Sequence, residues 1–256
     1  IRTGDGKIKI DSNGFEMMDY GSGLNAGFGR PFIGDANPIM DVKLNTRNSE
    51  GNSLSANAYA DFIILPFLKL PINGTTYLDE TRSTFVYNPY YGQFDSTGGT
   101  VSKEHDPYIT YNLQQLLNYN QTFSLHTVGL MLGHEYYNSK SYSLWGSKSK
   151  MFSQSNKELS GAVVDGQGAG SSLSEYNNEG YFARLQYDYK NTVFASASYR
   201  RDASSRFHPD YRWGSFWSVG AAWVLSKESW FKVPFIDELK YKISYGSQGN
   251  DNIGSY

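Results

Sequence analysis

Four short segments between residues 181 and 245 alternate apolar and polar side chains. A period of two sends successive side chains to opposite faces of an extended chain, so each segment predicts a β-strand with one apolar face and one polar face. In the third segment, Trp217 and Trp223 enclose the smaller Val219 and Ala221. Six residues at about 3.3 Å each span roughly 20 Å, close to the ~25 Å apolar band of a membrane-spanning barrel. The pattern therefore indicates strands that cross a lipid bilayer.

The two predicted faces differ in composition in all four segments. Trp and Tyr rings have an apolar body and a polar tip, which is why they collect at membrane interfaces. In several segments the apolar face has such a ring at one or both ends. The apolar positions are Tyr181, Ala183, Leu185, Tyr187, Tyr189, Val193, Ala195, Ala197, Tyr199, Trp217, Val219, Ala221, Trp223, Leu239, Tyr241, Ile243 and Tyr245. The alternate positions include polar or small residues, namely Arg184, Gln186, Asp188, Ser196, Ser198, Arg200, Ser218, Gly220, Ala222, Lys240, Lys242 and Ser244. We expect the first set to face hydrocarbon and the second set to face water.

Extended along the chain, the same reasoning predicts an all-β protein, an antiparallel up-and-down transmembrane β-barrel segment. Strands are expected near residues 53–64, 69–84, 107–119, 126–137, 178–189, 192–202, 213–225 and 237–247. The connections alternate between short ones at 65–68, 120–125 and 190–191 and longer polar ones at 85–106, 138–177 and 203–212. Short turns at one rim and long extracellular loops at the other are typical of bacterial outer-membrane barrels. The longer connection at 226–236, where we expect one helical turn around Trp230, is the exception.

The first 52 residues lack this pattern. Lys7 to Ile10 alternates and predicts a short strand, whereas residues 21–38 are rich in Gly and Pro and predict a loop. Its first residues, Ile1–Gly6, are neither a start methionine nor a signal peptide, and the chain stops directly after a predicted strand and turn. We expect it to be a piece of a longer protein.

Composition narrows the class further. The longest apolar run, Phe62 to Leu68, is broken by Pro66, so no segment reaches the ~18 residues that a membrane helix needs. Barrel strands are half polar, and a negative mean hydropathy is therefore compatible with them. The net charge of −2 gives no basic face for nucleic acid. The absence of cysteine excludes disulfides and thiolate metal sites.

The stretches Arg200–Phe207, Arg212–Ser218 and Ser244–Gly254 resemble the SusC/RagA family of TonB-dependent outer-membrane transporters. The resemblance is clear over about residues 105–256 and extends to 54–92. It is carried by Arg200–Phe207, Arg212–Ser218, Ser244–Gly254, Asn112–Asn120, Gly180–Tyr189 and Asn88–Gly92. Ala203 stands where the family usually has Gly, and Trp217 where it often has Pro; neither change breaks the strand pattern.

The resemblance implies a 22-stranded barrel in the bacterial outer membrane, filled by an N-terminal plug domain. Residues 1–256 would be a fragment of that barrel domain, about eight to ten strands, without the plug or the C-terminal strands. Such transporters import oligosaccharides or peptides, with a SusD-like surface lipoprotein as a lid and the TonB complex as the energy source. TonB would act through the missing N-terminal part. No bond is made or broken, so the resemblance implies a transporter surrounded by outer-membrane lipid and not an enzyme.

Motifs for metals and cofactors are weak. The four histidines, His105, His126, His134 and His208, lack the spacing of paired metal ligands, and we expect ordinary rim or loop histidines. Gly166–Ser171 superficially resembles a phosphate-binding loop, but no Lys follows it, so a flexible surface loop is the better interpretation. We therefore predict no metal or cofactor site.

Charged residues gather around one predicted loop, namely Arg200, Arg201, Asp202, Arg206, Asp210 and Arg212. As an acid–base pair, Asp202 and Asp210 would suit a glycoside hydrolase of sandwich or propeller form. A solvated loop base in which the charges neutralise one another is the favoured interpretation, and no catalytic residue is assigned. Arg184 and Arg200 are expected to face the barrel lumen, where they are also candidates for contact with a passing substrate.

Aromatic residues in or beside the long loops are candidates for sugar stacking. They are Tyr90, Tyr91, Phe94, Tyr136, Tyr137 and Trp145. Loop packing and the interfacial belt explain the same residues, so we assign no substrate-binding residue and expect specificity to lie in 85–106 and 138–177. The alternative to a transporter is a soluble extracellular β-rich carbohydrate-binding or adhesive module.

Overall fold

The computed structural model describes residues 1–19 and 37–251. In these residues the chain forms one α-helix, α1 (Pro38–Leu44), four short 3₁₀ helices and eight strands. The strands are β1 (Thr46–Leu65), β2 (Leu68–Tyr87), β3 (Thr100–Phe123), β4 (His126–Met151), β5 (Ala162–Tyr189), β6 (Val193–Ser204), β7 (Trp213–Val224) and β8 (Lys240–Ser247). The 3₁₀ helices are η1 (Gly92–Phe94), η2 (Leu159–Gly161), η3 (Pro209–Tyr211) and η4 (Leu225–Lys227). All eight predicted strands are confirmed.

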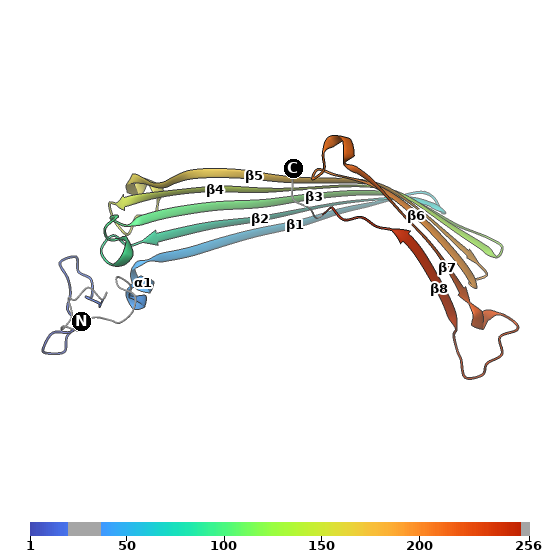
Figure 1. Ribbon diagram of the computed structural model, residues 1–256, viewed down its shortest axis with the longest axis horizontal. Helices are drawn as coiled ribbons and strands as arrows, with labels where there is room; N and C mark the ends of the chain where they lie inside the picture. Colours follow the sequence, from blue (N-terminus) through green and yellow to red (C-terminus); the bar gives the residue numbers. More distant parts are fainter. Residues whose placement is uncertain (20–36, 252–256) are drawn as a thin grey trace. The chain divides into compact units, whose positions relative to one another are not determined.

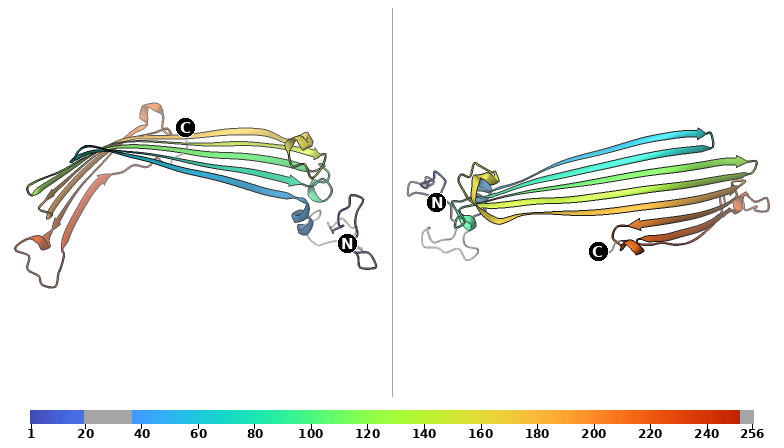
Figure 2. Two further views of the ribbon diagram at one scale, coloured as in Figure 1. Left: turned by 180° about the vertical axis from the view of Figure 1, so that it is seen from behind. Right: turned by 90° about the horizontal axis from the view of Figure 1, so that it is seen from above.

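The strands form a single sheet in chain order, from β1 to β8. Figures 1 and 2 show each strand beside its neighbours in sequence. The β5–β6, β6–β7 and β7–β8 pairs are antiparallel. Within the described part of the chain, β1 and β8 each have one neighbour and leave one edge unpaired. The predicted up-and-down barrel segment is confirmed.

The register across β5 to β8 separates the two faces. Leu185, Ala197, Val219 and Tyr245 lie directly opposite one another on the four strands. Directly opposite residues project from the same face of a sheet, so these apolar side chains share one side. The next row, led by Gln186 and its partners Ser196, Gly220 and Ser244, projects from the other side. The alternation read from the sequence therefore gives the correct faces.

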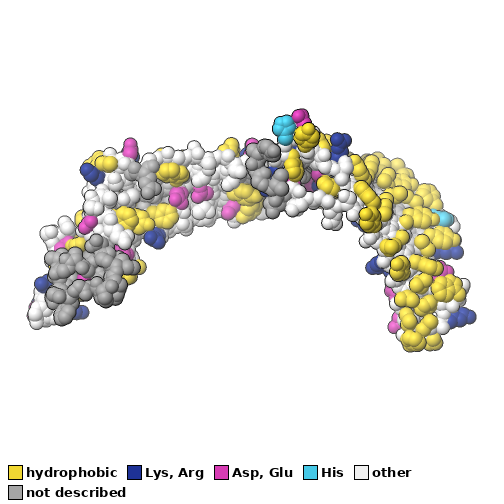
Figure 3. Space-filling model, viewed as in Figure 1, with side chains coloured by type: hydrophobic (Ala, Val, Ile, Leu, Met, Phe, Trp, Pro, Cys, Tyr) yellow, Lys and Arg dark blue, Asp and Glu magenta, His cyan; other side chains and the backbone are white. Residues whose placement is uncertain are grey.

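The apolar face of β5–β8 is exposed, as a lipid-facing surface should be. Along β6, Ala195, Ala197 and Tyr199 are exposed, whereas Ser196 and Ser198 are half-buried. Leu185, Val219 and Ile243 remain about half exposed, at 47%, 48% and 59%. Figure 3 shows hydrophobic side chains gathered over the part of the sheet that holds β6 and β7. A soluble sandwich would bury these residues against a second sheet, and the described residues form only one.

The contacts divide the chain into two compact units, which we describe separately. Unit 1 comprises residues 1–52, 79–107 and 142–173, and unit 2 comprises 53–78, 108–141 and 174–256. Unit 1 has two small apolar clusters. Met40 and Leu44 pack with Phe15, Met18 and Tyr91, and Val86, Val101 and Ala162 pack with Met151 and Leu159. Unit 2 contains β6, β7 and β8, and its apolar side chains lie mainly on its surface.

Helix α1 was not expected from the sequence, which predicted loop up to residue 38. Asn37 is its N-cap, and its Oδ1 accepts the backbone N–H groups of Ile39 and Met40. Pro38 occupies the first turn, where its missing N–H costs nothing. Met40 and Leu44 are four residues apart and therefore share the buried face. The rest of the predicted loop, residues 20–36, lies outside the described residues.

The two long loops are shorter than predicted. Only residues 88–99 separate β2 from β3, and only 152–161 separate β4 from β5. The strands extend into the rest of the predicted loops because backbone pairing continues beyond the apolar band, where apolar–polar alternation is no longer required. The Gly166–Ser171 segment lies within β5, so its interpretation as a flexible surface loop was wrong.

Two smaller expectations also change. Lys7 to Ile10 contributes only isolated bridges, Arg2 with Ile8 and Ile10 with Glu16, and not a strand. The helical turn expected around Trp230 is η4, which comes directly after β7. Trp230 instead packs edge-on against Trp223, with ring centroids 6.1 Å apart. None of the described helices is long and apolar enough to cross a membrane.

Candidate functional site

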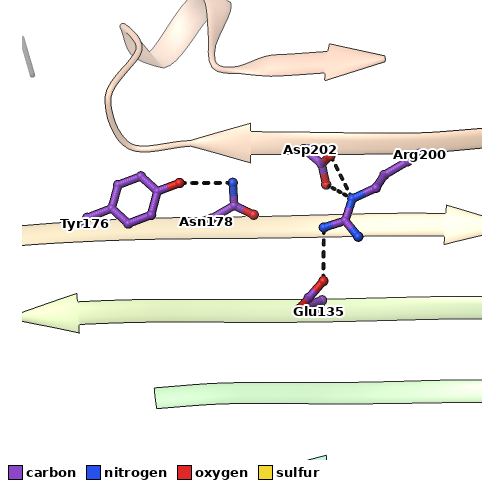
Figure 4. Close-up of polar contacts among 5 residues, drawn as sticks. All are labelled: Glu135, Tyr176, Asn178, Arg200 and Asp202. Carbon is purple, nitrogen blue, oxygen red and sulfur yellow. Dashed lines mark hydrogen bonds and ion pairs between the residues drawn. The ribbon is translucent and has the colours of Figure 1, made fainter. Parts of the chain in front are cut away.

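The polar face of unit 2 carries a charged network centred on Arg200 (Figure 4). Arg200 Nε lies 2.7 and 2.8 Å from the two carboxylate oxygens of Asp202, on the same strand. Its Nη2 donates to Oε2 of Glu135 on β4 at 3.0 Å. The carboxylates are mostly buried, and their side chains keep 20% and 24% of their surface exposed. One guanidinium therefore pairs with two carboxylates from different strands.

Two glycines make room for this network. The Arg200 guanidinium lies over the ring of Phe182, 5.1 Å from its centroid, and the ring itself lies against Gly133. A Cβ added at Gly133 would come within 2.2 Å of that ring, and one at Gly180 within 2.2 Å of Asp202 Oδ1. The absence of side chains at these two positions lets the ring and the carboxylate lie flat on the sheet.

We expect Gly133→Ala to lower the free energy of unfolding by about 1–3 kcal/mol, the usual cost of overpacking. The new methyl group would displace the Phe182 ring and with it the support under Arg200. The matched control is Gly74→Ala, another strand glycine of unit 2, whose added Cβ would meet only Leu113 at 4.0 Å. Denaturant titration of the full-length protein in lipid vesicles measures both. Equal stability of the two variants would show that the ring moves without cost.

A row of tyrosines crosses β3, β4 and β5 beside the network. The hydroxyl groups of Tyr108 and Tyr137 are 3.5 Å apart, and the rings of Tyr137 and Tyr176 are 6.0 Å apart. Tyr176 also accepts a long hydrogen bond from the amide of Asn178, at 3.5 Å (Figure 4). We call Tyr108, Tyr137 and Tyr176 the tyrosine row. Adjacent rings with hydroxyl groups provide both stacking surfaces and hydrogen bonds.

Charged groups lie beside Tyr176 at the end of the tyrosine row, and the pKa of Tyr176 is shifted. Tyr176 Oη donates to Oδ2 of Asp251 at 2.6 Å, and the Arg206 guanidinium lies 4.7 Å from the ring centroid. Burial raises the pKa of Tyr176 above its ordinary value, and the hydrogen bond to Asp251 raises it further. The same hydrogen bond lowers the pKa of Asp251. At neutral pH the pair is therefore a hydroxyl donor and a carboxylate.

A hollow of about 340 Å³ opens next to these groups. Asp202, Arg212, Tyr211 and Asp251 are among its lining residues. It offers carboxylates, a guanidinium and an aromatic ring to a polar ligand. Such a surface suits reversible contacts with polar groups.

The histidines do not meet at one site. His105 contacts Glu80 at 2.7 Å, His126 contacts the Tyr187 hydroxyl at 2.7 Å, and His208 contacts Asp210 at 3.5 Å. His134 bonds Gln115 at 2.6 Å and Glu179 at 3.2 Å. No group of three or more possible metal ligands occurs among residues 1–19 and 37–251.

The charged residues around 200–212 have different partners and do not all lie on one face of the sheet. Asp202 pairs with Arg200, whereas Asp210 contacts His208. Arg201 projects from the face opposite to Arg200, because successive residues of a strand alternate. The structure thus gives the proposed acid–base pair two separate sets of partners. Arg184 lies on the polar face, as predicted, next to the serines of β6 and β7.

The candidate aromatic residues are mostly packed. Phe94 stacks on Tyr87 at 4.1 Å, Tyr90 lies 4.8 Å from Phe15, and Tyr91 packs on the cluster of Met40 and Leu44. Trp145 lies against Gly170 of β5. Tyr136 donates to Asn177 at 3.2 Å. Tyr137 alone joins the tyrosine row.

Sequence reasoning missed Tyr108, Tyr176 and Glu135. Tyr176 was placed in a loop, and Tyr108 was one of many strand tyrosines. The usable signal was the alternation of faces along β5. Tyr176, Asn178 and Gly180 are even-numbered like Arg184 and Gln186, so they lie on the polar face, beyond the apolar band.

The fold and its two faces define the class of protein. A single antiparallel up-and-down sheet with one exposed apolar face and one charged, tyrosine-lined face is part of the wall of a membrane β-barrel.

Comparison with known proteins identifies the type of barrel. The chain is 27% identical over 229 residues to the TonB-dependent receptor SusC of Bacteroides thetaiotaomicron, a match covering 85% of this chain and 22% of that receptor. It is 42% identical over 76 residues to the TonB-dependent receptor P39 of Formosa agariphila, covering 29% of this chain and 7% of that receptor. No protein-family profile matches the chain. The predicted resemblance to SusC/RagA-type TonB-dependent receptors is confirmed.

Solved structures agree on the fold. The RagAB peptide transporter matches 91% of this chain with a TM-score of 0.79 at 24% sequence identity, and the match covers 26% of that chain. Its open-open state matches 96% of this chain with the same TM-score, and covers 27% of that chain. The present chain thus spans about a quarter of those structures and 22% of SusC.

Proposed function

We propose that this chain forms part of the barrel wall of a TonB-dependent transporter that imports oligosaccharides or peptides across the bacterial outer membrane. The observation that carries the proposal is the clean division of β5–β8 into an exposed apolar face and a polar face. The likeness to SusC over 85% of the chain supports the coupling to TonB. The fold is shared with RagAB, which is a peptide importer, and this supports a polymeric nutrient as cargo.

In this proposal, residues 1–256 are one TonB-dependent receptor-like barrel domain, and the plug and the TonB-contacting segment belong to other parts of the receptor. A SusD-like surface lipoprotein would deliver the glycan or peptide at the extracellular rim. The tyrosine row and the Arg200 network would then line the path of the substrate. The wall makes and breaks no bond, so the proposed protein is a transporter and not an enzyme.

The competing hypotheses have less support. A soluble carbohydrate-binding module would need a cover for the apolar side chains of β5–β8. The glycoside hydrolase hypothesis took Asp202 and Asp210 as its acid–base pair, and these two carboxylates have different partners.

Uptake by the bacterium that encodes the full-length receptor tests the proposal. We expect deletion of the gene to abolish growth on a defined oligosaccharide or peptide as the sole nutrient, and the full-length gene to restore it. Growth on monosaccharides and free amino acids, which are small enough to need no such importer, is the control. Unchanged uptake of every oligosaccharide and peptide tested would contradict the proposed function.

A further inference from the structure

We propose that Arg201 and Trp213 form a binding site for the phosphate group of a lipid in the extracellular leaflet of the membrane. The inference goes beyond transport. It rests on the lipid-facing assignment of the sheet and not on the identity of the cargo.

The register places both residues on the apolar face. Arg201 lies directly opposite Tyr181 of β5 and Ser215 of β7, and Ala203 lies opposite Trp213. All belong to the set of positions that includes Leu185 and Val219. Arg200, one residue earlier, projects from the other face and is neutralised by two carboxylates. The two neighbouring arginines therefore serve opposite sides of the wall.

Their depth coincides with one boundary of the apolar band. Trp213 and Trp223 are ten positions apart on β7, which is about 34 Å along the strand and about 25 Å across a membrane at the usual tilt near 45°. That is the expected ~25 Å height of the band. At that tilt, the six positions from Trp217 to Trp223 span only about 14 Å, so Trp213 and not Trp217 marks this boundary. The Arg201 guanidinium lies over the Trp213 ring, 5.3 Å from its centroid. Long basic side chains reach in this way from apolar surface toward the headgroups.

Both side chains offer hydrogen-bond donors that the protein does not use. Arg201 contacts the Trp213 ring but has no ion pair among the described residues, and the Trp213 indole N–H has no acceptor there. Guanidinium has a planar set of five N–H donors and no acceptor, a geometry that matches phosphate oxygens. Adjacent donors without acceptors favour an anion.

The carboxylate of Glu179, two residues before Tyr181, already has two partners. Glu179 accepts from the Tyr181 hydroxyl at 2.7 Å and contacts His134 at 3.2 Å. The centroid of the Tyr181 ring on β5 lies 4.7 Å from that of His134 on β4 and 6.1 Å from that of Trp213 on β7. These rings extend the apolar surface up to Arg201, which favours an anion attached to a lipid over a free phosphate ion.

The full-length receptor, stripped of lipid in detergent and examined by native mass spectrometry, tests the site. The probes are lipid A and its dephosphorylated form. We expect Arg201→Gln to weaken lipid A binding about tenfold, because a charged hydrogen-bonding partner is lost. The matched control is Arg184→Gln, which removes an arginine from the polar face of the same sheet and should leave binding unchanged.

The wild-type receptor should bind dephosphorylated lipid A as weakly as the Arg201→Gln variant binds lipid A. Equal binding of lipid A by Arg201→Gln and the wild type would overturn the site, and so would an equal loss in Arg184→Gln. Displacement of lipid A from Arg201 by millimolar inorganic phosphate would show that the site takes free anions and would overturn its assignment to lipid. A thermal unfolding curve like that of the wild type establishes that the variant is folded.

Discussion

Ala197→Arg is expected to lower the free energy of unfolding in a bilayer by about 2–4 kcal/mol. Ala197 lies opposite Leu185 and Val219, near the middle of the span between Trp213 and Trp223. A charged side chain at that depth must leave water or reach far along the strand to a headgroup. Ala195→Arg should cost less, since Ala195 is closer to the boundary at Trp223.

The matched control is Ser196→Arg, one residue away on the polar face. We expect it to change stability by less than about 0.5 kcal/mol, the usual range for a solvated surface substitution. Denaturant-induced unfolding of the full-length receptor in vesicles measures all three variants. The same cost for Ala197→Arg and Ser196→Arg would mean that the face carrying Ala197 does not contact hydrocarbon, and the barrel assignment would fail.

Loss of the Arg200 guanidinium should also lower the free energy of unfolding. Arg200→Gln leaves the mostly buried carboxylates of Glu135 and Asp202 beside one another without a cation. Hydrogen bonds to charged groups contribute about 1.5–3 kcal/mol. Because 39% of the Arg200 side chain is exposed and water screens part of the interaction, we expect a cost near the lower end, about 1.5 kcal/mol.

A second set of variants separates lost attraction from new repulsion. Adding Glu135→Gln and Asp202→Asn to Arg200→Gln removes the two uncompensated charges and should recover most of the lost stability. Arg184→Gln, without an ion pair in the described residues, serves as the control. If the triple variant is less stable than Arg200→Gln alone, repulsion between the carboxylates is not the cause of the loss.

The sequence predicts the membrane part of the fold well because lipid imposes a strict pattern. Within the apolar band of β5–β8, every second residue must suit hydrocarbon, and so strand positions and faces can be recognised there without any partner information. Beyond the apolar band this alternation is no longer required. The upper parts of β4 and β5, such as Asn138–Met151, therefore lose the alternation and were predicted as loop.

The candidate site is less predictable for a different reason. Glu135 and Arg200 are 65 residues apart in the chain, and Tyr108 and Tyr137 are 29 apart. Their contacts depend on the register between strands, which composition alone does not fix. Helix α1 had a local signal, an Asn–Pro pair at its start, but seven residues are too few to show helical periodicity.

The outer edges of β1 and β8, which no described strand pairs with, affect any experiment on this segment. An amide group that meets hydrocarbon without a hydrogen-bonding partner costs several kcal/mol, and a strand edge presents a whole series of them. Neither strand edge can therefore face lipid acyl chains. Each edge must pair with another strand before insertion into the bilayer is favourable. Expressed by itself, the sheet should join edge to edge with its own copies, and the smallest piece that enters a bilayer as a monomer is the closed cylinder.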